Sequence, residues 1–89
     1  MELKKGIPVI SKAGHDKDSC YIVLYIEGTC AYLVNGKNRT IDFPKKKKLK
    51  HLQPMDVVPA VLQEKLQKNE AWTNEEIKRA IKLLQSGLI

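Results

Sequence analysis

The sequence has few of the features that mark secreted, membrane or metal-binding proteins. Among its 89 residues there are two cysteines, Cys20 and Cys30, which lie ten residues apart in apolar runs. This spacing is not typical of zinc ligands, so we expect no metal site and predict that both cysteines are small buried hydrophobes. The longest apolar run, residues 20–26, is too short to cross a bilayer as a helix. The N-terminus has no apolar stretch typical of a secretory signal. We therefore expect a cytoplasmic protein with no membrane contact.

Residue patterns typical of catalysis are also scarce. The only histidines are His15, which precedes Asp16, and His51, far along the chain. A general base acts on a nucleophile or metal beside it, in a pocket that excludes water, and no pattern in this sequence indicates either. We predict that the protein is not an enzyme and needs no cofactor.

Positive charge is present in excess, and it is unevenly distributed. The formal net charge is +6, with eleven Lys and Arg against five Asp and Glu in residues 1–53, and five of each in residues 54–89. The whole excess therefore lies in the first segment. A nucleic acid is the natural polyanionic partner for such a segment, and the alternative is a charge that serves solubility alone.

The first half of the chain alternates with the period of β-strands. Candidate strands cover residues 8–11, 21–26, 30–34, 37–43 and 48–52. The run 21–26 is apolar on both faces, which predicts a central strand. Asn35-Gly36 is typical of a type I′ hairpin turn, in which both residues take positive φ. Four or five short antiparallel strands in about fifty residues indicate a small barrel.

The second half changes to a helical period. Val58, Val61, Leu62 and Leu66 mark a first helix, with Asp56 as its cap and Pro59 in its first turn. Thr73 and Glu76 have the spacing of a capping box, and Gly87 is predicted to end the helix. The second helix carries an apolar stripe of Ile77, Ala80, Ile81, Leu84 and Leu88. Trp72, between the helices, is predicted to plug the helical hairpin against the barrel.

Residues 6–18, GIPVISKAGHDKD, followed by Tyr21-Ile22-Val23, resemble the KOW motif. The match is similar to the version in certain large-subunit ribosomal proteins of archaea and eukaryotes, close to V-x-S-x-A-G-x-D-K. Bacterial KOW-domain RNA-binding proteins of about this length share a glycine-containing hairpin and a lysine-rich stretch before the last strand. Asn35-Gly36 and residues 45–52 resemble these, and residues 72–77 match the tail of those proteins more loosely.

The resemblance implies an SH3-like (KOW) antiparallel β-barrel of about five strands over residues 1–53. A C-terminal helical hairpin, residues 54–89, is expected to pack on it within one compact domain. The resemblance also implies that the first loop, from Lys12 to Lys17, faces RNA. One departure is Asp18, at a place where relatives often have a basic residue or glycine, and this acid weakens the case for phosphate contact at that end of the loop.

We predict a basic RNA-binding face. Its candidate residues are Lys12, His15, Lys17, Lys37, Arg39, Lys45, Lys46, Lys47, Lys48 and Lys50. If the lysine run is extended, alternate side chains point to opposite sides, so about half of them face one groove. Arg39 is the best candidate for bidentate phosphate contact, because its guanidinium fork matches phosphate geometry. The competing interpretation of the run is a solvated, flexible connector between strands.

The expected function is non-catalytic contact with ribosomal RNA, on the ribosome or as part of it. Tyr21, Tyr25, Tyr32 and Phe43 are predicted to be core residues or cross-strand pairs rather than platforms for bases. The alternative function is a KOW adaptor that docks onto transcription or translation machinery through the stripe of its helical tail. A non-specific DNA binder is the third hypothesis.

Overall fold

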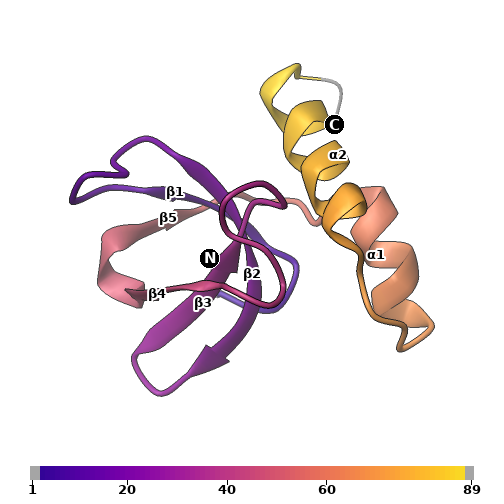
Figure 1. The fold of residues 1–89 in the computed structure, drawn as a ribbon, viewed down its shortest axis with the longest axis horizontal. Helices are drawn as coiled ribbons and strands as arrows, with labels where there is room; N and C mark the ends of the chain where they lie inside the picture. Colours follow the sequence, from indigo (N-terminus) through magenta and orange to yellow (C-terminus); the bar gives the residue numbers. More distant parts are fainter. Residues whose placement is uncertain (1–2, 88–89) are drawn as a thin grey trace.

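Residues 3–87 are described by a computed structural model, in which five strands precede two helices. The strands are β1 (Pro8–Ser11), β2 (Cys20–Glu27), β3 (Cys30–Val34), β4 (Lys45–Lys48) and β5 (Leu52–Pro54), with a 3-10 turn (Leu49–His51) between the last two. The helices α1 (Ala60–Gln67) and α2 (Asn74–Gln85) lie together on one side of the sheet (Figure 1). This confirms the predicted class, a small antiparallel β structure followed by two C-terminal helices.

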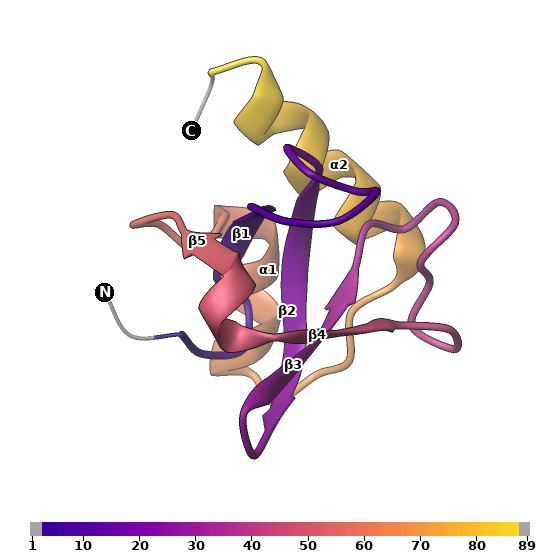
Figure 2. The ribbon, with the colours of Figure 1, turned by 90° about the vertical axis from the view of Figure 1, so that its left-hand side faces the viewer.

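The sheet curls so that its two edges approach each other. All strand pairings are antiparallel, in the order β4-β3-β2-β1-β5, which makes β4 and β5 the edges of the sheet in residues 3–87. In a flat sheet the two edges would lie about 19 Å apart, whereas the backbone from Lys48 to Leu52 spans at most about 14 Å. The short 3-10 turn that joins β4 to β5 is therefore possible only because the sheet curls (Figure 2).

The first half of β2 is apolar on both faces because it is buried on both, as its sequence predicted. Tyr21 and Val23 lie in a core cluster inside the curled sheet, together with Ile7, Val9, Ala31, Leu33 and Leu52. Ile22 lies in a second cluster on the outer face, together with Val34, Leu62, Trp72, Ile77, Ala80 and Ile81. The helices thus cover part of the outer face of the sheet.

The strand predicted over residues 37–43 is wrong. Residues 35–43 form turns and bends, and β4 begins only at Lys45. Asn35 lacks the positive φ that a type I′ turn requires. Its side-chain Oδ1 instead accepts hydrogen bonds from the backbone N–H groups of Lys37 and Arg39, at 2.9 and 3.0 Å. The Asn35 side chain therefore stabilises a longer loop through hydrogen bonds to the loop backbone, and no two-residue turn forms.

Packing against α2 explains why this loop replaces a hairpin. Gly36 has a φ of 80°, and a Cβ at this position would lie 2.5 Å from the carbonyl oxygen of Asn74 and 2.7 Å from Cγ of Lys78. The Asn74 side chain also accepts a hydrogen bond from the backbone N–H of Ile41, at 3.0 Å. Contacts with a helix almost forty residues further along the chain therefore override the local preference of Asn-Gly.

The lysine run is a strand, and the strand predicted over residues 48–52 is divided. Lys45–Lys48 pairs in register with β3, so the run is not a flexible connector. The 3-10 turn (Leu49–His51) follows, and only Leu52–Pro54 pairs with β1. The predicted strand, residues 48–52, thus began at the last of the four lysines that pair with β3.

The ends of the two helices are fixed in different ways. The predicted capping box is confirmed: the Glu76 N–H donates to Thr73 Oγ1 at 3.2 Å, and the Thr73 N–H donates to Glu76 Oε1 at 2.9 Å. The C-terminal stop is consistent with Gly87, whose φ is 76°. The prediction of Asp56 as the first cap is wrong, because α1 has Pro59 at its N-cap, with no side-chain hydrogen bond.

Trp72 fills the space between the helices and the sheet, which confirms its predicted role as a plug. It is buried, and its Nε1–H donates to the carbonyl oxygen of Leu62 at 3.0 Å. The ammonium of Lys5 lies 5.1 Å from the centre of its ring. Of the apolar stripe, Ile77 and Ile81 are buried, whereas Leu88 lies outside the described residues.

The two cysteines are half-buried free thiols, so they are less deeply buried than predicted. Burial raises the pKa of the Cys20 thiol. Within residues 3–87 there is no helix of the length and apolar character needed to span a membrane.

Candidate nucleic-acid interface

The four lysines of β4 alternate between two environments. Lys45 and Lys47 lie opposite core residues of β3, and the Lys47 side chain is only 11% exposed. Lys46 and Lys48 project from the other face of the strand and are exposed. The predicted alternation is confirmed, and it divides the run into two solvent-facing lysines and two inward-facing ones.

The inward-facing lysines belong to a polar network around Asp16, in the loop between β1 and β2. The Asp16 carboxylate accepts hydrogen bonds from Lys47 Nζ at 2.7 Å, Ser11 Oγ at 2.9 Å and Tyr21 Oη at 3.0 Å, and Lys45 Nζ lies 3.5 Å away. Lys47 also donates to the carbonyl oxygen of Ala13 at 2.8 Å. These contacts tie the β1–β2 loop to the edge strand β4.

The network fixes the ionisation of its members. Burial alone would raise the pKa of the Asp16 carboxyl, but the hydrogen bonds from Lys47, Ser11 and Tyr21 and the charge of Lys45 hold that pKa far below its usual range. Burial and the hydrogen bond to Asp16 raise the pKa of Tyr21 to about 12. Asp16 is therefore ionised at neutral pH, and it neutralises much of the charge that the inward-facing lysines carry.

The remaining basic side chains of these segments are exposed. We call them the loop–β4 surface: Lys12, His15, Lys17, Lys46, Lys48 and Lys50. Within the described part of the chain none of them takes part in an ion pair. The Lys12 ammonium lies 3.5 Å from Oε1 of Gln53, a neutral group. The Asp16 network thus joins the β1–β2 loop to β4, although the two segments are more than twenty-five residues apart in sequence. The lysines of both segments that form no ion pair are exposed to solvent.

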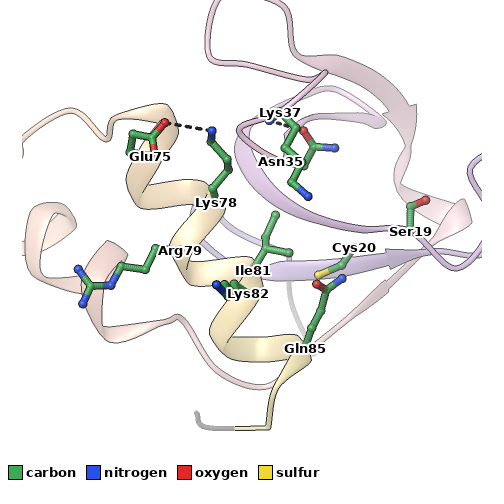
Figure 3. A pocket seen from close by; sticks show the side chains of 10 residues that line it. All are labelled: Ser19, Cys20, Asn35, Lys37, Glu75, Lys78, Arg79, Ile81, Lys82 and Gln85. Atoms are coloured by element: carbon green, nitrogen blue, oxygen red, sulfur yellow. Dashed lines mark hydrogen bonds and ion pairs between the residues drawn. The ribbon is translucent and has the colours of Figure 1, made fainter.

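Lys37 and Arg39 form none of the hydrogen bonds to Asp16 in the described residues, although the charge of Arg39 opposes the rise in the pKa of Tyr21. Lys37 lines a groove of about 740 Å³ between the β3–β4 loop and α2, opposite Lys78 (Figure 3). Arg79 and Lys82 of α2 also line it, although the Arg79 side chain points away from the loop. Other residues that line it are Ser19, Cys20, Asn35, Glu75, Ile81 and Gln85. Arg39 is half-buried, and its backbone carbonyl accepts hydrogen bonds from the loop. The structure does not bring these two predicted residues into the contacts that join the first loop to β4.

Neither the protein-family models nor the curated proteins give a match to this sequence.

Sequence reasoning missed the basic groove because the charges of residues 54–89 sum to zero. In the structure Lys78 is paired with Glu75 at 3.0 Å, but Arg79 and Lys82 form no ion pair within residues 3–87. The spacing of Lys78 and Lys82, four residues apart, placed them on one side of a helix. The helical spacing of Lys78 and Lys82 therefore predicted a basic side of the second helix, but the zero net charge of residues 54–89 drew no attention to it.

The aromatic predictions are correct only in part. Tyr21 is buried, and Tyr25 and Tyr32 form the expected cross-strand pair. Phe43 is neither core nor strand, because it lies in the β3–β4 loop and is 74% exposed. Tyr25 is 44% exposed, so the cross-strand pair is open to solvent rather than enclosed.

Proposed function

We propose that this protein is a non-catalytic, cytoplasmic RNA-binding protein of the KOW type that contacts ribosomal RNA phosphates through the loop–β4 surface. A-form RNA hides its base edges in a deep, narrow major groove, so a compact basic surface recognises phosphates and shape. Each phosphate that a lysine neutralises releases condensed counterions, which favours binding at low salt. The lysines with that role are Lys12, Lys17, Lys46, Lys48 and Lys50, and His15 is the sixth residue of the surface.

One observation carries this proposal: the contacts of Lys47 with Asp16 and Ala13 place the first loop against β4. The KOW-like loop and the lysine run are then neighbours in space. The network also removes Lys45 and Lys47 from the set of free cations, so the proposal is narrower than the sequence prediction. Phosphate contact is assigned to the outward lysines.

The adaptor function has less support from the packing of the helical tail. An adaptor that docks through the apolar stripe of α2 needs Ile77 and Ile81 at a free surface. Both side chains are buried against the sheet and α1. The exposed side of α2 carries cations instead, including Arg79 and Lys82.

The test is co-sedimentation with ribosomes from a cell extract at low salt, using the full chain. We expect the protein in the large-subunit fraction, and we expect the double substitution K46Q/K48Q to weaken RNA binding and to lower its salt slope by about 1.5. The matched control is K65Q/K68Q, at the C-terminal end of α1, which removes the same charge from residues outside the loop–β4 surface. Absence of the wild-type protein from ribosomal fractions, or equal losses in the two double variants, would contradict the proposal.

A further inference from the structure

Two tyrosines form a stacked pair on the outer face of the sheet. Tyr25 of β2 and Tyr32 of β3 are cross-strand partners, with ring centroids 4.4 Å apart and an angle of 15° between the rings. Tyr25 is 44% exposed although it is a large aromatic residue on a strand. An exposed, parallel aromatic stack at this place is not needed to enclose either core cluster.

Tyr25 is exposed and Tyr32 is half-buried because β2 is longer than the elements that flank it. β1 pairs only with Cys20, Tyr21 and Ile22, so the second half of β2 has β3 as its strand neighbour. The helices cover the same outer face at Ile22 and Val34. Towards the β2–β3 turn the hairpin extends away from both helices (Figure 1). The tyrosines therefore lie beyond the covered part of the face.

Two exposed lysines lie on the same face, in the neighbouring strand. Lys46 is the cross-strand partner of Tyr32, and Lys48 is the partner of Cys30, one step nearer the turn. Lys48 and Lys50, with Gly28, Thr29 and Leu49, line a surface hollow of about 450 Å³ beside the turn. Cations thus flank the aromatic stack on one side.

One acid lies close to this arrangement. Glu27 is the cross-strand partner of Cys30 and is exposed on the same face, beyond Tyr25. Its carboxylate disfavours a phosphate on that side of the stack. A bound strand of nucleic acid is therefore expected to place its phosphates along β4 and its bases over β2 and β3.

We propose that the tyrosine pair is a stacking platform for the unpaired bases of single-stranded RNA, with Lys46 and Lys48 holding the adjacent phosphates. This inference rests on the proposed RNA-binding function and specifies its substrate. In a duplex the bases are already stacked on each other, whereas a base that is splayed out of a loop or single strand can extend the tyrosine stack. Stacking of this kind tolerates any sequence, because every base has a π face.

The face has three properties that suit RNA better than another protein chain. Its aromatic groups are planar and parallel, its charge is positive along one side, and the lysines repeat every second residue of an extended strand. That repeat is about 6.8 Å, close to the spacing of phosphates along an extended single strand. We therefore assign the face to RNA and make self-association an outcome of the test.

The test compares a single-stranded uridine decamer with a 20-base-pair RNA duplex, by fluorescence anisotropy with the full chain. Tyr25→Leu keeps apolar bulk against Tyr32 but removes the ring. We expect this variant to bind the decamer about 5- to 100-fold more weakly and the duplex as the wild type does. Tyr25→Phe, which keeps the ring, is expected to retain the decamer affinity. Thermal unfolding of each variant verifies that it is folded.

Each other result has a defined meaning. If Tyr25→Leu and Tyr25→Phe bind the decamer equally well, or if Tyr25→Leu loses affinity for both RNAs alike, the stacking platform is excluded while the phosphate-binding function stands. If the wild type binds neither RNA, the proposed function fails and the inference fails with it. Sedimentation that shows a dimer in the wild type and a monomer in Tyr25→Leu would assign the face to a second copy of this chain.

Discussion

The Lys47 ammonium lies 2.7 Å from the Asp16 carboxylate, and this contact joins two segments that the sequence separates by thirty residues. The carboxylate side chain is 13% exposed, so the pair is largely shielded from solvent. A group buried in this way depends on its partners, because removing one leaves the other charge uncompensated. The pair therefore holds the first loop against β4, and its two charges are paired with each other.

Asp16→Asn is expected to lower the free energy of unfolding by about 2–4 kcal/mol at neutral pH, because it removes the acceptor at the centre of the network. The folded protein holds the pKa of Asp16 below its unfolded value of about 3.9. Its contribution is therefore complete above that value and is lost as the pH falls. Urea unfolding at several pH values is the measurement: the difference between wild type and variant must narrow below about pH 4. A difference that stays constant down to pH 2 would contradict this role.

Lys46→Met and Lys47→Met remove the same group from neighbouring positions but are expected to affect different properties, RNA binding and stability respectively. Lys47→Met leaves Asp16 without its nearest partner, which should cost about 1–3 kcal/mol of stability. Lys46→Met should leave stability within about 0.5 kcal/mol and reduce the salt slope of RNA binding by roughly 0.7–0.9. Chemical denaturation and anisotropy titrations at several salt concentrations measure the two quantities. Equal losses of stability in the two variants would show that the inward-facing Lys47 stabilises the protein no more than the outward-facing Lys46.

Gly36→Ala is expected to destabilise the protein by roughly 2–4 kcal/mol, since the new methyl group would have to displace the N-terminus of α2. Gly28→Ala is the control. Gly28 also has a positive φ, of 59°, but its Cβ would meet no atom within 4 Å, so only the backbone cost of about 1–2 kcal/mol applies. Thermal or urea unfolding distinguishes the two variants. Equal losses would mean that the contact with α2 adds nothing to the backbone cost.

Thr73→Ala is expected to cost about 1 kcal/mol of stability, because the N-terminus of α2 loses the hydroxyl that accepts from the Glu76 N–H. Thr73→Ser keeps that acceptor and should lose less than half as much. Denaturation curves followed by circular dichroism provide the comparison. If the serine variant is as unstable as the alanine variant, the capping box is not what stabilises the start of this helix.

Local patterns predicted the elements whose causes are local. The apolar run of β2 and the capping box at Thr73 and Glu76 depend on residues close in sequence, and both were predicted correctly. The loop after Asn35 was not, because its conformation is set by Asn74 and Lys78 of a distant helix. Turn propensity carries no information about such a contact.

The candidate site was predicted in its residue types but not in their roles. The strand was predicted over residues 48–52 rather than Lys45–Lys48, and alternation of the lysines was expected only if the run is extended. The identity of the buried side depends on Asp16, which the sequence shows only as one acid in a basic loop. Tyr25 was predicted to be a core residue or a cross-strand partner rather than a platform for bases, and it is a cross-strand partner whose ring is exposed. The exposure of Tyr25 follows from the lengths of β1 and β2 and from the part of the sheet that the helices cover. No local sequence pattern predicts these tertiary features.

The position of β4 at the edge of the sheet has a consequence for the behaviour of the protein in concentrated solution. An edge strand offers unpaired backbone N–H and C=O groups to any second strand that approaches it. Here a second copy of β4 that paired antiparallel would bring lysine opposite lysine along the strand, and like charges in that position repel. The edge is thus protected against strand-to-strand aggregation by the side chains that we assign to RNA.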